Sequence, residues 1–352
     1  GVTHGPHEHG RALYFAFNDP KDDDKGPGYY QYPLMFNNRE GYLDITRFTV
    51  EDGGENVVFT IDCRRPIPRR RPDGSTEPKG WWLQMMDIYI DKDGKSSKGY
   101  QRSLPGRHVK FREDSTWEKM VLVTPNHSRT VEKMLEERTS DMDLVHMRND
   151  IIVPHRSYAQ GFTFVVYVPK HEIGVPKPDW GYQVLMCAYK EGNLSYGQFQ
   201  NEEVVKFAGQ ESFGGGSDYR GDPNVIDILA PSTGEQYRIL SDYESNPYSG
   251  DNRYAALSMV RSSGLGPKPS GSAGVTASPG VTVLSSESSS GSARGSSSGS
   301  ARESSSGSAR ESSSGSAREA RSAASPFPSP PEDSNDSRGD SEHSLHSFEG
   351  GF

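Results

Sequence analysis

Hydrophobic and polar residues alternate with a period of two in several short runs between residues 12 and 260. The clearest run is 56–63, in which the apolar side chains of Val57, Phe59, Ile61 and Cys63 share one face. The residues between them point to the other face. This pattern is typical of a β-strand that buries one of its faces.

The preceding run, 42–52, keeps its alternation only if the period is broken once. Leu43 and Ile45 occupy apolar positions, and Phe48 and Val50 continue the pattern after a shift. The turn residues Asp-Gly-Gly at 52–54 then separate this run from the next one. The two runs therefore predict a β-hairpin.

Turn residues separate or follow the other apolar runs of the chain. These runs predict further strands at 12–17, 82–91, 118–125, 161–169 and 180–190. One segment, 128–147, contains good helix formers from Glu132 to Arg138, but its apolar residues fit a helical period only briefly. Its secondary structure stays ambiguous. Many short strands with turns between them favour an all-β sandwich or barrel over an α/β sheet.

The composition changes near Ser262, after which Ser, Gly, Pro, Ala and Arg dominate. Four copies of an eight-residue unit of Ser, Gly, Ala and Arg begin at residues 288, 296, 304 and 312, the last three ending in Glu. Because so small a polar unit has no face to bury, it predicts a flexible spacer. We therefore expect a flexible N-terminus (1–11), a β domain (12–260) and a disordered tail (261–352).

The net charge of the chain and the length of its apolar runs argue against a nucleic-acid partner and a membrane span. The chain carries 48 acidic and 39 basic residues, a formal charge of −9, and no dominant basic region, so we expect no nucleic-acid partner. No apolar run approaches the roughly 18 to 20 residues that a membrane span requires. The start at Gly1 fits either cleavage of a secretory signal or an excised fragment.

The two cysteines, Cys63 and Cys187, match no zinc or haem spacing. Two alternatives stay open for them. They form one long-range disulfide in an exported protein, or they are two reduced, buried thiols.

A dense acidic segment, FNDPKDDDKGPGYYQYP, spans residues 17–33. Calcium prefers six to eight oxygen ligands, and Asp19, Asp22, Asp23 and Asp24 supply carboxylates at short spacing beside a Gly-Pro-Gly turn. We therefore interpret these four aspartates as candidate calcium ligands. The alternative is an ordinary solvated loop.

Two weaker metal-binding patterns accompany this segment. Asp91 and Asp93 precede Gly94 and could add oxygen ligands, although a simple acidic hairpin turn is the better explanation of this pattern. The histidines at positions 4, 7 and 9 could bind zinc or copper, or could be incidental residues of a frayed terminus.

Aromatic residues are the candidate carbohydrate-binding groups. Adjacent residues on a strand face opposite ways, so we expect one of Trp81 and Trp82 to pack inside and the other to face solvent. An exposed indole suits stacking on the apolar face of a sugar ring, and Tyr30 and Tyr32 are further candidates. The chain contains no nucleophile elbow, P-loop, dinucleotide fingerprint or zinc-protease motif. We therefore expect that the protein is not an enzyme.

A family resemblance emerges from several segments in a fixed order. They are the acidic segment, then GYLDITRFTVEDGGENVVFTI, IYIDKDG, LPGRHVKF, PDWGYQVLMCAYK, FGGGSD and DPNVIDILAP, spread between Ala12 and Tyr243. This region resembles the C-terminal binding module of glucodextranase, which is also similar to a domain of amylopullulanases. The family belongs with the DOMON-like and family-nine carbohydrate-binding sandwiches.

The resemblance implies a two-sheet antiparallel β-sandwich, jelly-roll-like, that is exported, non-catalytic and bound to a polysaccharide or cell-envelope glycan. It also implies structural calcium at Asp19, Asp22, Asp23 and Asp24. After the third strand the chain departs from the family pattern, with the basic, Pro-rich segment RRPIPRRRPDGSTEPKGWW. A separate glycoside hydrolase is a possible partner of such a module.

Two alternatives stay open beside this interpretation. The first is a structural surface-layer or extracellular appendage component, which would self-associate. The second is a haem-binding redox module, since some DOMON-like sandwiches use Met and His as axial ligands. The candidate ligands are then Met142, His146, Met147 and His155.

Overall fold

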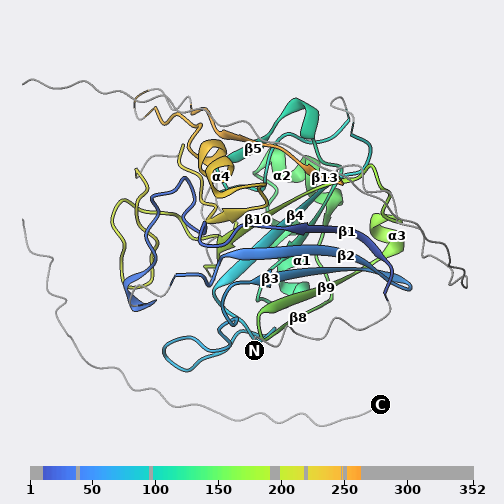
Figure 1. Cartoon of the computed structure of the whole chain (residues 1–352), viewed down its shortest axis with the longest axis horizontal. Coiled ribbons are helices and arrows are strands. Elements are labelled where there is room, and N and C mark those ends of the chain that lie inside the picture. Colours follow the sequence, from blue (N-terminus) through green and yellow to red (C-terminus); the bar gives the residue numbers. More distant parts are fainter. Residues whose placement is uncertain are drawn as a thin grey trace, which may run out of the picture. The chain divides into compact units, whose positions relative to one another are not determined.

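The first sheet contains five antiparallel strands, stacked one below another in Figure 1. In spatial order they are β1 (Leu13–Asn18), β2 (Ile45–Gly53), β3 (Asn56–Cys63), β9 (Thr163–Pro169) and β8 (Arg156–Gln160). The predicted hairpin is present as β2 and β3.

The break in the alternation of β2 has a structural cause. The register between β2 and β3 shifts between Ile45 and Arg47, so that Thr46 is an extra residue on β2. Such a β-bulge moves the following side chains to the opposite face. Ile45, Phe48 and Val50 consequently all reach the same core.

The second sheet lies behind the first in Figure 1, and its two eight-residue strands are buried along their whole length. In spatial order they are β11 (Asp227–Ile228), β10 (Gly181–Ala188), β4 (Gln84–Asp91), β6 (Lys119–Val123) and β7 (Ile151–Ile152), with β13 (Val260–Arg261) also paired to β10. A small two-stranded sheet joins β5 (Val109–Phe111) and β12 (Ala255–Leu257). The pairs β6–β7 and β5–β12 are parallel, unlike the antiparallel pairing expected throughout.

Two hydrophobic cores lie on opposite faces of the second sheet. Met86 and Ile88 of β4 face the first sheet and pack with Phe48 and Phe59 in the core between the sheets. The alternate residues, such as Tyr89, pack in another core on the far face. Because the second sheet is covered on both faces, its strands are nearly continuous hydrophobic runs.

Short helices cover the far core. The ambiguous segment 128–147 forms α1 (Ser128–Glu137) and α2 (Met142–Met147), which bury residues such as Val131 and Leu144 against the second sheet. The remaining helices are α3 (Lys170–Ile173), α4 (Thr233–Leu240) and the short 3-10 helices η1 (Leu34–Phe36), η2 (Glu113–Ser115) and η3 (Arg148–Asp150). The fold is thus an all-β sandwich with a helical layer on one side.

This computed structural model describes residues 11–36, 40–94, 98–190, 199–217, 221–246, 248 and 252–262. All of them belong to the compact unit that spans residues 1–273. The predicted His-containing N-terminus and the predicted disordered repeat tail lie almost entirely outside the described residues, so the domain boundaries remain predictions. Within these ranges, no helix combines the length and apolar character that crossing a bilayer requires.

Candidate functional site: a buried acidic cluster

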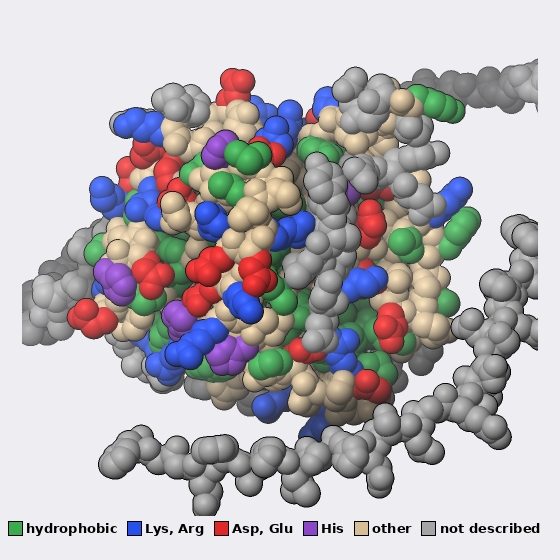
Figure 2. Space-filling model, turned by 180° about the vertical axis from the view of Figure 1, so that it is seen from behind, with side chains coloured by type: hydrophobic (Ala, Val, Ile, Leu, Met, Phe, Trp, Pro, Cys, Tyr) green, Lys and Arg blue, Asp and Glu red, His purple; other side chains and the backbone are tan. Residues whose placement is uncertain are grey.

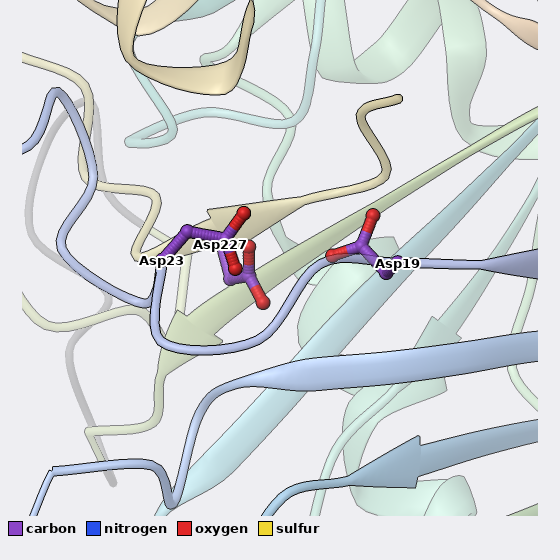
Figure 3. Close-up of side chains that lie close together, drawn as sticks. All are labelled: Asp19, Asp23 and Asp227. Carbon is purple, nitrogen blue, oxygen red and sulfur yellow. The ribbon is translucent and has the colours of Figure 1, made fainter. Parts of the chain in front are cut away.

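Three carboxylates from distant parts of the chain meet after the end of β1 (Figure 3). Asp19 follows β1 directly, Asp23 lies in the loop beyond it, and Asp227 comes from β11 of the second sheet. One oxygen of each lies within 4.8 Å of one oxygen of the other two, and all three residues are buried. We call these three residues the acidic cluster.

The loop that carries Asp23 is held by backbone contacts to the segment around Asp227 and to α4. The N–H of Gly26 donates to the carbonyl of Ile226 at 2.8 Å, and the amide of Gln236 donates to the carbonyl of Asp23. Gly26 has a φ of 54°, and a Cβ there would lie 2.3 Å from the ring of Tyr30. The turn therefore requires glycine at this position.

Backbone N–H groups stabilise part of the acidic cluster but leave several oxygens without a partner. Ala230 N–H donates to Asp19 Oδ1 at 2.9 Å, and Ile45 N–H donates to Asp227 Oδ2 at 2.6 Å. Asp19 Oδ2 and both carboxylate oxygens of Asp23 are buried and accept no hydrogen bond within the described residues. Unpartnered buried carboxylate oxygens are costly unless another group binds them.

Two further buried aspartates, Asp24 and Asp44, lie beside the acidic cluster. Asp24 Oδ2 accepts from the Tyr32 hydroxyl and the Gly41 N–H, and Asp44 Oδ2 accepts from the Asp22 N–H at 2.7 Å. The Oδ1 atom of each is buried and has no hydrogen-bond donor in the part of the chain that the structure describes.

The positive charge near these five carboxylates is small. Among the described residues, the one ion pair to any of them joins Arg64 to Asp44, with 3.8 Å between Nη1 and Oδ2. Arg64 also pairs with the exposed Asp22. The site thus concentrates negative charge that the described side chains do not neutralise.

The pKa values of these carboxyl groups are all raised. Burial, followed by the charges of neighbouring aspartates, raises the pKa of Asp19 to about 9 and that of Asp44 to about 8. Burial raises the pKa of Asp23 to about 6. Burial also raises the pKa of Asp227 and of Asp24. Without a bound cation, folding would therefore favour protonated carboxyl groups near neutral pH.

The donor set fits a hard divalent cation. All of the available atoms are oxygens, which calcium and magnesium prefer. Calcium–oxygen distances of about 2.3 to 2.6 Å allow oxygens on opposite sides of one ion to lie roughly 5 Å apart. The 4.8 Å limit within the acidic cluster is compatible with that spacing. Asp19, Asp23 and Asp227 are the residues that would hold the ion.

The four aspartates predicted from the sequence are placed differently from one another. Asp19 and Asp23 belong to the acidic cluster, and Asp24 lies buried beside it. Asp22 instead faces solvent in the left-handed backbone region, with a φ of 71°. Its carboxylate pairs with Arg64, whose Nη1 also lies 3.8 Å from Asp44 Oδ2.

Sequence reasoning missed Asp227 and Asp44. Asp227 lies within the segment DPNVIDILAP, where a carboxylate stands among apolar residues of a buried strand. An acidic residue in so apolar a run is the signal that could have identified it. Asp44 carries a similar signal, because it stands between Leu43 and Ile45.

Asp91 and Asp93 form a second acidic group with Glu118. Asp91 Oδ1 accepts from the N–H groups of Asp93 and Gly94, at 3.1 and 2.6 Å, and its Oδ2 pairs with Arg261. These contacts are those of an acidic turn with its own basic partner.

This second group lies away from the acidic cluster. Asp91 pairs with Gly181 and Asp227 pairs with Met186 on the same strand, β10. Five residues along a strand correspond to roughly 17 Å. The two acidic segments therefore do not converge on one cation.

The expected exposure of one tryptophan is wrong. Trp81 and Trp82 are both buried, with exposed fractions of 0% and 7%. Trp81 donates from Nε1 to the carbonyl of Gln84 at 2.9 Å, and Trp82 stacks on Phe36. Both residues lie before the start of β4, so the alternation of side chains along a strand does not apply to them. Neither offers a free ring face for a sugar.

The two candidate tyrosines also point inward. Tyr30 donates its hydroxyl to the carbonyl of Pro223 at 2.7 Å, and Tyr32 donates to Asp24. Both are buried, with exposed fractions of 3% and 6%. Their contacts fix the acidic loop and leave no surface for a glycan.

The four candidate haem ligands differ in their burial. Met147 is buried in the far core, Met142 is largely exposed, His146 is exposed, and His155 lies 3.2 Å from Glu132. The histidines at positions 4, 7 and 9 lie outside the described residues. Cys63 and Cys187 are free thiols buried in different cores, which corresponds to the second of the two alternatives left open for them.

The comparisons with known proteins bear on the described fold as a whole. A search of curated proteins finds no match to the chain. A family profile, described as the C-terminal, SLH-like binding module of glucodextranase, matches residues 14–257. This match includes all three members of the acidic cluster and more than half of the chain. The chain belongs to the family of the C-terminal, SLH-like binding module of glucodextranase.

Proposed function

We propose that this chain is an exported, non-catalytic module that binds a carbohydrate or a cell-envelope glycan, and that calcium in the acidic cluster stabilises its sandwich. The observation that carries the calcium assignment is the set of buried carboxylate oxygens without partners at Asp19 and Asp23. The binding assignment is supported by the family, whose description is that of a binding module.

A bound cation would remove the repulsion between the carboxylates and would join the two sheets. Asp19 and Asp23 follow a strand of the first sheet, whereas Asp227 belongs to the second. One ion held by all three would therefore cross-link the sandwich at this end. Because the unfolded chain has no such site, the free energy of calcium binding would add to the stability of the fold.

The charge distribution supports a glycan over a nucleic acid as the ligand. Figure 2 shows acidic and basic side chains interspersed on one face of the described domain. The whole chain has a formal charge of −9. Nucleic-acid binding depends on concentrated basic charge, which neither observation supports.

The SLH-like description of the family favours a second candidate, attachment to or assembly in a cell-surface layer. This role predicts self-association and no saturable binding of soluble sugars. Sedimentation velocity over a wide concentration range separates the two roles, because a monomer at all concentrations contradicts assembly.

The proposed function can be tested by co-sedimentation with insoluble starch, cross-linked dextran and purified cell walls, in calcium and after chelation. We expect retention on at least one of these materials in calcium and no release of reducing sugar. Absence of retention on every material contradicts the binding assignment. Release of reducing sugar by the pure protein contradicts its non-catalytic character.

A further inference from the structure

A cavity of about 730 Å³ lies at the loop 101–110, which leads into β5. Its walls come from this loop, from the segment 140–143 at the start of α2, and from residues 252 and 254 before β12. Of the residues predicted from the sequence to bind a ligand, the candidate haem ligand Met142 lines it, and the predicted carbohydrate-binding and calcium-binding residues do not. A cavity of this size is within the range that holds small ligands in proteins.

Two stacked rings contribute to the wall of the cavity. The rings of His108 and Tyr254 are nearly parallel, with an interplanar angle of 4° and 5.6 Å between centroids. Both side chains are half-buried and line the cavity. The stacked pair therefore brings aromatic side chains to the cavity, which the buried tryptophans do not.

The backbone at His108 has a strained conformation that the surrounding contacts maintain. Its φ is 54°, in the left-handed region that non-glycine residues rarely adopt. Such conformations often occur at ligand-binding positions. His108 Nδ1 lies 2.9 Å from the carbonyl of Asp222, which fixes the ring.

A buried polar network holds the rest of this loop. Arg107 is fully buried and donates to the two carboxylate oxygens of Asp87 at 2.7 and 3.0 Å. The side-chain amides of Asn201 and Asn224 both donate to the carbonyl of Gly106 at 2.8 Å. These hydrogen bonds hold the loop that forms one wall of the cavity, which would reduce the entropy lost on binding.

The polar groups around the rings suit a neutral, hydroxyl-rich ligand. Gln101 and Lys110 provide hydrogen-bond donors, and Asp141 provides acceptors. Arg102 and Asp143 pair with each other, so these two charges compensate locally. A sugar has an apolar C–H face for the rings and hydroxyl groups that both donate and accept. A polyanion would instead require uncompensated basic charge.

We infer that this cavity is the glycan-binding site and that it takes a neutral oligosaccharide segment, with a sugar ring against Tyr254 and His108. This inference rests on the proposed function and specifies where that function resides. It moves the ligand-binding residues from the Trp81–Trp82 region to the loop 101–110 and the segment that precedes β12.

The test measures affinity for soluble starch and soluble dextran by isothermal titration calorimetry in calcium. The variants are Tyr254→Ala and His108→Gly, the second of which removes a ring while glycine keeps the left-handed backbone conformation. We expect each variant to weaken binding about tenfold with an unchanged melting temperature. Should Tyr254→Ala fail to fold, His108→Gly carries the test.

The matched control is Phe207→Ala, which removes an aromatic side chain that is 77% exposed and does not line the cavity. We expect wild-type affinity from this variant. If the wild type binds and both cavity variants bind equally well, the cavity inference is overturned while the proposed function stands. If the wild type binds glycan neither in this test nor in the co-sedimentation test, the proposed function fails and the inference fails with it.

Discussion

Asp23 is the member of the acidic cluster whose two carboxylate oxygens both lack a hydrogen-bond donor among the described residues. Its side chain is completely buried. Its neighbour Asp22 has the same chemistry but faces solvent and pairs with Arg64. These adjacent residues therefore separate a cation-binding role from the general effect of acidic charge.

We expect Asp23→Asn to abolish high-affinity calcium binding and Asp22→Asn to retain it. Loss of one carboxylate removes a principal ligand and part of the charge of the acidic cluster. The control is structurally mild because asparagine tolerates the left-handed conformation found at position 22. Equilibrium dialysis with atomic emission gives the stoichiometry, and equal calcium binding by both variants would falsify the assignment of Asp23.

The raised pKa values also predict how pH affects the metal-free protein. The pKa values of Asp23, Asp44 and Asp19 are raised to about 6, 8 and 9, above the ordinary value of 3.8. Between the unfolded and folded pKa values the folded state binds more protons than the unfolded state. Stability is therefore greatest at acid pH and is lost as pH rises through this range.

Melting curves of the chelated protein between pH 5 and pH 9 should accordingly show a falling melting temperature. Calcium requires deprotonated carboxylates, so the stabilisation that it adds should grow over the same interval. A chelated protein whose stability rises steadily from pH 5 to pH 9 would contradict the raised pKa values.

At the scale of elements, the segment 222–228 connects the acidic cluster to the cavity. At one end the carbonyl of Asp222 contacts His108, and Asn224 N–H donates to the carbonyl of Arg107 at 2.9 Å. At the other end Asp227 belongs to the acidic cluster. Ordering of Asp227 by a cation would therefore also order the wall of the cavity.

We predict that chelation weakens glycan binding roughly fivefold, a coupling at the lower end of the usual allosteric range. Calorimetric titrations of soluble starch or dextran, with and without calcium, measure this factor. Linkage requires the glycan to raise the calcium affinity by the same factor, which provides an internal control. Identical glycan affinities in both conditions would show that the two sites are independent.

The elements with clear alternation could be predicted from the sequence, and those without it could not. The run 56–63 coincides with β3, and the broken period of 42–52 reflects a real bulge at Thr46. The short strands β5, β7, β11, β12 and β13 have two or three residues each, too few to show a period. β7, β11 and β13 form because longer strands offer them partners, whereas β5 and β12 pair with each other.

The acidic site was predictable only in part for a similar reason. Asp19 and Asp23 lie close in the sequence, and their density indicated an oxygen site. Asp227 reaches them through the pairing of β11 with β10, which no local pattern shows. The inward packing of Trp81 and Trp82 likewise depends on tertiary contacts, and alternation was the wrong rule for residues outside a strand.

At the scale of the whole molecule, the sandwich has two cores and one end where charge replaces apolar packing. Phe48 and Phe59 stack within the core between the sheets, where burying such a side chain contributes about 1.5 to 3 kcal/mol. The acidic cluster has the opposite effect in the absence of a cation. A bound divalent ion would convert this end from a site of repulsion into a link between the two sheets.

Differential scanning calorimetry at neutral pH, on metal-stripped protein before and after addition of calcium, addresses this conversion. At a calcium concentration of 100 times the dissociation constant, binding adds about 2.7 kcal/mol of stability. For a domain of this size we expect the melting temperature to rise by about 5 to 10 °C and to fall back after chelation. An identical melting temperature with calcium and with chelator would contradict a calcium site in the acidic cluster.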